Sequence, residues 1–99
     1  MACALCSDEA PLEFFPVPGG PDGAGAQLCA NCRSQIEGTP DPDHMRCLAS
    51  AMWSEDAAVQ VLAARLLRRL SDHGWARDLA DQLWLEDETR AWAENAAAP

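Results

Sequence analysis

The chain has 99 residues, 48% of them apolar, which is enough for one small domain or a minidomain with a helical extension. It carries 16 acidic residues against 7 arginines and no lysine, so its formal net charge is −9, which opposes phosphate binding and disfavours a nucleic-acid partner. No apolar run approaches the ~20 residues of a membrane helix, and the first residues lack the apolar core of a secretory signal. We therefore expect a cytoplasmic protein without membrane contact.

The strongest motif in the chain is a pair of C-x-x-C sequences, formed by Cys3, Cys6, Cys29 and Cys32. A two-residue gap lets both sulfurs of a pair reach one ion, and two such pairs complete a tetrahedral shell of thiolates. The sequence therefore predicts one structural Zn²⁺ ion on these four residues, with iron or a redox dithiol as alternatives. A rubredoxin-like iron site usually has glycine after each pair, where this chain has Ser7 and Arg33.

The residues between the two pairs predict a β-hairpin. Residues 12–17 are typical of a short strand in which Pro16 favours a strand end or edge, and the glycine-rich residues 18–26 form the expected hairpin tip. The second pair then opens a short helix that ends at Gly38, so that the helix N-terminus stabilises the thiolates. This order of elements is typical of a treble-clef or zinc-ribbon-like module, which we assign to residues 1–38.

Residues 39–99 predict a bundle of three to four short α-helices packed on this module, which makes the expected fold class small α+β. Asp41 is the expected N-cap of the first helix, and Ser54 caps the second, which Gly74 ends. The apolar face of the first helix consists of Met45, Leu48, Ala49 and Met52. The apolar stripe of the second consists of Val59, Leu62, Ala63, Leu66 and Leu70.

Two further helices are expected after Gly74. In the first, Trp75, Leu79 and Leu83 recur at helical spacing, and the second carries Trp92. The only local basic cluster precedes them in the chain and is interpreted as the solvated face of a helix: Arg65, Arg68 and Arg69.

A fifth cysteine, Cys47, lies one helical turn after His44. The plain interpretation is a small buried thiol beside an exposed or capping histidine. The alternative is that His44 or Cys47 joins the metal shell in place of another ligand or forms a second site, and a histidine beside the shell is a further possibility. Four cysteines saturate one zinc and leave no open position for water, and neither a third catalytic group nor an oxyanion donor accompanies the pair. We expect no catalytic residue, and we interpret the acidic residues near the cysteines as solvated: Glu9, Glu13 and Glu37.

Four blocks of sequence resemble the N-terminal region of the PhnA-like proteins, a family named for an alkylphosphonate-utilisation operon. They are LCANCRSQIEG, DPDHMRCL, AMWSEDAAVQVLAARLLRRL and WARDLADQLWLEDETRAWA, which follow in order over nearly the whole chain. The resemblance implies a zinc-ribbon-like module on the four cysteines, followed by a helical segment. Longer members continue into a small β-rich C-terminal domain, which we expect to be missing here. The chain also departs from the family pattern at Met45 and Ala64, where tryptophan is expected, and at Ala57, where proline is expected.

Together these features favour a non-catalytic, zinc-stabilised module that presents an acidic helical surface to a protein partner or to itself as an oligomer. Val61, opposite the apolar stripe of its helix, and two tryptophans, Trp53 and Trp84, exceed what a small core is expected to hide. The alternative is a metal-dependent hydrolase of phosphonate metabolism with His44 and Cys47 at an open metal position. A nucleic-acid-binding zinc protein is the third hypothesis.

Overall fold

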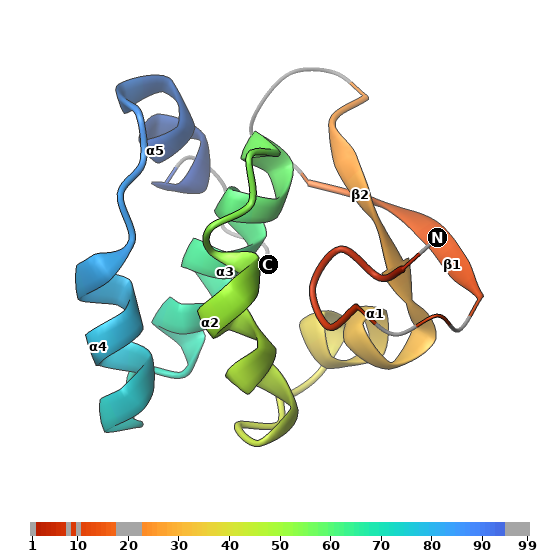
Figure 1. Cartoon of the computed structure of the whole chain (residues 1–99), viewed down its shortest axis with the longest axis horizontal. Coiled ribbons are helices and arrows are strands. Elements are labelled where there is room, and N and C mark those ends of the chain that lie inside the picture. Colours follow the sequence, from red (N-terminus) through yellow and green to blue (C-terminus); the bar gives the residue numbers. More distant parts are fainter. Residues whose placement is uncertain (1, 8, 10, 18–22, 95–99) are drawn as a thin grey trace.

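The computed structural model describes residues 2–7, 9, 11–17 and 23–94. Over these residues the chain is a small α+β protein with one antiparallel hairpin and five α-helices (Figure 1). The elements are β1 (Leu12–Pro16), β2 (Gly25–Cys29), α1 (Ala30–Glu37), the 3₁₀ helix η1 (His44–Cys47), α2 (Leu48–Ala51), α3 (Ala57–Arg69), α4 (Gly74–Gln82) and α5 (Asp87–Glu94). No helix within the described ranges has both the length and the apolar character needed to span a membrane.

The predicted hairpin and the helix after it are confirmed. Leu12 pairs with Cys29 at the open end of the hairpin and Pro16 pairs with Gly25 at the other, so the proline lies at the end of its strand as expected. A Cβ atom at Gly25 would collide with the backbone carbonyl of Phe15, which explains glycine at this position. Residues 18–22, part of the expected tip, lie outside the described residues.

Helix α3 forms the centre of the molecule. The hairpin and α1 lie on one side of it and α4 and α5 on the other, with α2 packed across it (Figure 1). The predicted apolar stripe of α3 is buried, but Val61, expected on the opposite side, is also fully buried at 0% exposure. The expectation of an exposed Val61 is wrong because other elements pack against several sides of α3, and a helix covered in this way buries more than one stripe.

Two predicted boundaries of α3 are also wrong. The N-cap of α3 is Asp56, whose carboxylate accepts a hydrogen bond from the Ala58 N–H at 3.0 Å, whereas the Ser54 hydroxyl accepts from Asp56 N–H in the preceding turn. Gly74 is the first residue of α4, and α3 already ends at Arg69. The two candidate capping residues are two positions apart, and either side chain is a good acceptor, so sequence preference does not separate them.

The first predicted helix is split into η1 and α2. The Asp41 carboxylate accepts a hydrogen bond from the Asp43 N–H at 3.0 Å and so closes a turn ahead of η1 instead of capping an α-helix. Of the predicted apolar face, Ala49 is exposed, because the change from 3₁₀ to α geometry alters which positions face inward. The other members of that face are buried: Met45, Leu48 and Met52.

Two of the clustered arginines hold other elements in place. Arg65 is only 5% exposed, and its guanidinium donates to the backbone carbonyls of Trp92 at 2.7 Å and Ala93 at 3.2 Å. Arg69 is exposed but donates to the carbonyls of Ile36 and Gly38 at the end of α1. The interpretation of the cluster as a solvated face is therefore wrong for Arg65, whose buried charge is stabilised by the last carbonyls of α5.

Candidate metal centre

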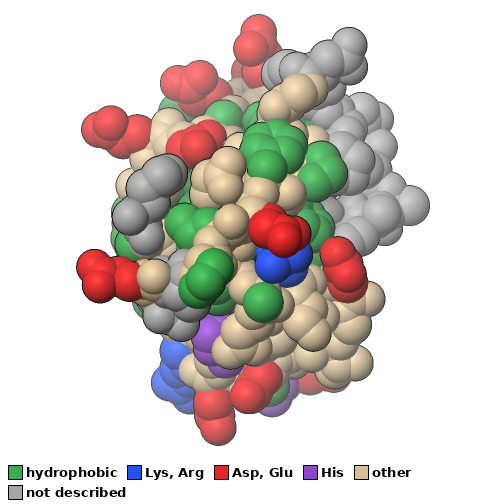
Figure 2. All heavy atoms as spheres, turned by 90° about the vertical axis from the view of Figure 1, so that its right-hand side faces the viewer, with side chains coloured by type: hydrophobic (Ala, Val, Ile, Leu, Met, Phe, Trp, Pro, Cys, Tyr) green, Lys and Arg blue, Asp and Glu red, His purple; other side chains and the backbone are tan. Residues whose placement is uncertain are grey.

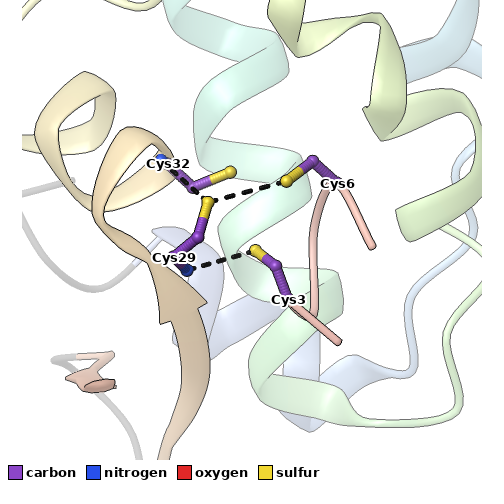
Figure 3. Close-up of side chains that lie close together, drawn as sticks. All are labelled: Cys3, Cys6, Cys29 and Cys32. Carbon is purple, nitrogen blue, oxygen red and sulfur yellow. Dashed lines mark hydrogen bonds between the residues drawn. The ribbon is translucent and has the colours of Figure 1, made fainter. Parts of the chain in front are cut away.

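The four predicted ligands come from two places in the fold. Cys3 and Cys6 lie in the N-terminal loop, whereas Cys29 is the last residue of β2 and the N-cap of α1, and Cys32 lies in the first turn of that helix. Their sulfurs point toward one another across the gap between loop and helix (Figure 3). Because β2 leads directly into α1, the hairpin delivers the second pair to the first one.

The geometry of the cluster fits a single metal ion. All four Sγ atoms lie within 4.8 Å of one another, the Sγ atoms of Cys6 and Cys29 are 3.6 Å apart, and none of the four forms a disulfide. A tetrahedron with metal–sulfur bonds of about 2.3 Å has sulfur–sulfur edges of roughly 3.8 Å. Three of the side chains are buried and Cys6 is half-buried, so one ion would be enclosed by the four sulfurs.

The first pair forms a tight loop that the second pair does not repeat. The Ser7 N–H donates to the Cys3 carbonyl at 3.0 Å, and Ser7 has a φ of 63°, the left-handed conformation usually filled by glycine. Arg33, the equivalent residue after the second pair, lies within α1 instead. The two pairs are therefore structurally different, unlike the two equivalent loops of a rubredoxin-like site. In the sequence, the position of Ser7 directly after the first pair was the only indication of this conformation.

Backbone N–H groups donate to the cluster. The Cys29 N–H lies 3.4 Å from the Cys3 Sγ, and the Cys32 N–H lies 3.5 Å from the Cys29 Sγ. Burial raises the pKa of Cys3, but backbone N–H groups of Cys6, Cys29 and Leu5 outweigh it and lower the pKa to about 7. These donors favour a thiolate at Cys3, the form in which cysteine binds a metal.

Cys32 experiences the opposite effect. Burial, and next to it the negative charge of Cys3, raise the pKa of Cys32 far above its ordinary value. The cluster therefore resists holding several thiolates unless a cation compensates their charge. This conflict is what a divalent ion bound among the four sulfurs would remove.

His44 lies directly beside the cluster, although it is not one of the four residues that converge. Its Nε2 atom is 3.3 Å from the Cys32 Sγ, and the ring is half-buried. The expectation of an exposed or capping histidine is therefore wrong, because His44 contacts the cysteine cluster at Cys32. The physical reason is that η1 packs beside α1, which the sequence spacing of His44 did not reveal.

Other candidate residues lie where the sequence predicted them. Cys47 is a half-buried thiol, and burial together with the charges of Cys6 and Cys3 raises its pKa to about 11. The three glutamates near the cysteines are exposed, and Glu13 forms a surface ion pair with Arg33 at 2.8 Å. None of these acidic residues contributes to the cluster.

Comparisons of the chain with protein-family models, with curated proteins and with solved structures found no match.

Proposed function

We propose that the chain binds one Zn²⁺ ion through four thiolates and that this ion has a structural role. The observation that carries the proposal is the convergence of four sulfurs within 4.8 Å, from residues that are far apart in sequence. Four cysteine ligands complete a tetrahedral zinc shell and leave no position for a reactive water. The ligands would be Cys3, Cys6, Cys29 and Cys32.

The proposal assigns the N-terminal part to the treble-clef variety of zinc module. Support comes from the order of its parts: a tight loop with the first pair, a hairpin, and a second pair at the start of α1. The N-terminus of α1 adds a favourable dipole and an N–H donor at the second pair. The resemblance to the PhnA-like proteins, which rests on the sequence blocks given above, agrees with this arrangement.

The role that we propose for this zinc-stabilised chain is a non-catalytic interaction module for a protein partner or a second copy of itself. Two tryptophans just after α2 and α4 support it, because Trp53 is 61% exposed and Trp84 is 69% exposed. Phe14 of β1 is 51% exposed, and Figure 2 shows hydrophobic side chains across the middle of the hairpin face with acidic ones around them. Exposed aromatic residues with a polar surround are typical of protein interfaces.

One observation favours a second candidate, a metal-dependent hydrolase. The 3.3 Å separation between His44 Nε2 and Cys32 Sγ places an imidazole where a small shift would make it a metal ligand. A shell in which histidine replaces one cysteine, or in which three protein ligands leave room for water, would provide the open position that hydrolysis needs. Nucleic-acid binding receives no such support, and the net charge of −9 opposes it.

The deciding experiment is metal content per chain combined with X-ray absorption at the zinc edge, on protein purified without added metal. We expect one zinc in an all-sulfur shell. Cys32→Ser removes a fully buried ligand and should abolish zinc retention, whereas the control Cys47→Ser removes a thiol outside the cluster and should leave one zinc per chain.

Two results would change the assignment. Absence of metal from protein purified under reducing conditions, and failure to take up added zinc, would overturn the proposed metal site. Nitrogen or oxygen in the metal shell would instead place His44 or water at the ion, favour the hydrolase, and justify assays on phosphate and phosphonate esters.

A further inference from the structure

A second feature of the molecule lies away from the cysteines, between α3, α4 and α5. It is a pocket of about 350 Å³, within the range of small-molecule sites. Much of its lining is apolar and comes from all three helices and the α4–α5 connection: Ala64, Leu67, Ala80, Leu83, Leu85 and Ala93. Such a lining would receive a hydrocarbon group.

The polar part of the lining is unusual for so acidic a chain. Three of the seven arginines line this pocket, Arg68, Arg77 and Arg90, and among the described lining residues Glu94 is the only acidic one. A protein of net charge −9 thus concentrates positive charge at one hollow, where it attracts anions locally. The three arginines outweigh Glu94, so the described lining suits a ligand with an anionic group.

The guanidinium groups of Arg68 and Arg90 have N–H donors available for a ligand, whereas one donor of Arg77 is already used. Arg77 is held by a hydrogen bond of 2.7 Å from its Nη1 to the Ser71 carbonyl, at the turn between α3 and α4. Over the described part of the chain, Arg68 and Arg90 make neither an ion pair nor a side-chain hydrogen bond. Guanidinium groups match the planar geometry of a carboxylate and bind it through paired hydrogen bonds.

We propose that this pocket binds a small amphipathic carboxylate, such as a medium-chain fatty acid, with its acyl chain against the leucines and its carboxylate at Arg68 and Arg90. Arg77 contributes positive charge while it keeps the α3–α4 turn in place. The ligand combines the two chemical features of the lining, and the pocket volume limits it to a small molecule. This site is independent of the metal centre and of the proposed interaction role.

The test is an NMR titration of the zinc-loaded, ¹⁵N-labelled full chain with octanoate. We expect saturable shifts of the amides of Leu67, Leu83 and Ala93. Octan-1-ol, which has the chain without the charge, and acetate, which has the charge without the chain, should each bind at least about tenfold more weakly. Inorganic phosphate should produce no saturable shift of these amides.

Two variants test the two halves of the ligand. The double substitution Arg68→Gln/Arg90→Gln should weaken octanoate binding about tenfold. Its control, Arg33→Gln/Arg46→Gln, removes the same charge outside the pocket and should leave the affinity unchanged. Ala64→Phe, which fills the pocket without changing the charge, should abolish the shifts, while circular dichroism confirms that each variant remains folded.

Three outcomes would overturn the proposal. The first is that octanoate shifts no pocket amide. The second is that both double variants lose affinity equally, which would mean that only net charge matters. If dilution of the protein without ligand moved the same amides, a second copy of the chain would be the occupant instead.

Discussion

At the scale of single residues, the fold gives the thiol of Cys47 a different environment from the thiols of the four clustered cysteines. Its thiol is half-buried beside the cluster without belonging to it. Burial, and then the charges of Cys6 and Cys3, raise its pKa from 9.0 to about 11. The native state therefore holds the proton more tightly than the unfolded state, and the stability due to this group is complete below pH 9 and declines as the pH rises toward 11.

We therefore predict that Cys47 of the folded protein reacts slowly with iodoacetamide at pH 8, because burial is the largest cause of its raised pKa. A pKa two units above its ordinary value lowers the thiolate fraction on the order of a hundredfold. Peptide mapping by mass spectrometry after timed alkylation, in buffer and in denaturant, measures this ratio, and Cys47→Ser provides the blank. Alkylation in buffer at the rate of an unfolded peptide thiol would show that the site is open and its pKa ordinary.

At the scale of elements, the position of α5 depends on one buried cation. Arg65 of α3 donates hydrogen bonds to the carbonyls of Trp92 and Ala93, near the C-terminal end of α5. Burial, and next to it the charge of Arg68, lower the pKa of Arg65 below its ordinary value. The guanidinium thus offsets the cost of its burial through hydrogen bonds to the end of the helix dipole.

We predict that Arg65→Met lowers the free energy of unfolding by about 1–3 kcal/mol, because it removes two buried hydrogen bonds to the end of α5 while roughly keeping the side-chain volume. Urea unfolding followed by tryptophan fluorescence measures the loss. The control Arg68→Met, one turn away and exposed, should change stability by less than about 0.5 kcal/mol. Equal effects of the two substitutions would mean that Arg65 contributes no more than a surface residue does.

The elements also show which sequence signals were sufficient. The start of α1 could be predicted because the second cysteine pair follows the predicted hairpin and has to reach the expected ion. The ligand spacing of Cys29 and Cys32 and the local helix preference therefore indicate the same residues. The start of α3 was misread because Ser54 and Asp56 are both good caps. Local preference alone does not decide between such neighbours, and the packing of the helix selects one of them.

In the candidate site, too, some features could be predicted from the sequence and others could not. The four cysteines were predicted because their spacing is fixed by the chemistry of a tetrahedral ion. The contact of His44 with Cys32, and the burial of Arg65 and Val61, depend on how η1, α3 and α5 pack, which is information carried by the whole fold. The arginine-lined pocket between three helices was missed for the same reason, because its residues are scattered from 64 to 94.

At the scale of the whole molecule, one buried apolar cluster joins the N-terminal part to the helices. It contains Leu28 of β2 and Ile36 of α1 together with the inward side chains of α2, α3 and α5. Helix α3 contacts β2 directly, and Arg69 donates to carbonyls at the end of α1. A small chain with a shared core of this kind would gain stability in all of its described parts from the metal that we propose.

We therefore predict that removal of the metal destabilises the helices as well as the hairpin. All four tryptophans lie at or after residue 53, so their fluorescence reports on the helical part alone, whereas zinc release to a chromogenic chelator reports on the cysteines. In a urea titration under reducing conditions, the two signals should change at the same midpoint, because the shared core couples both parts into one two-state transition. Zinc release at clearly lower urea than the fluorescence change would instead show that residues 1–38 and 39–99 unfold as separate units, with the core contacts between α3 and β2 too weak to couple them.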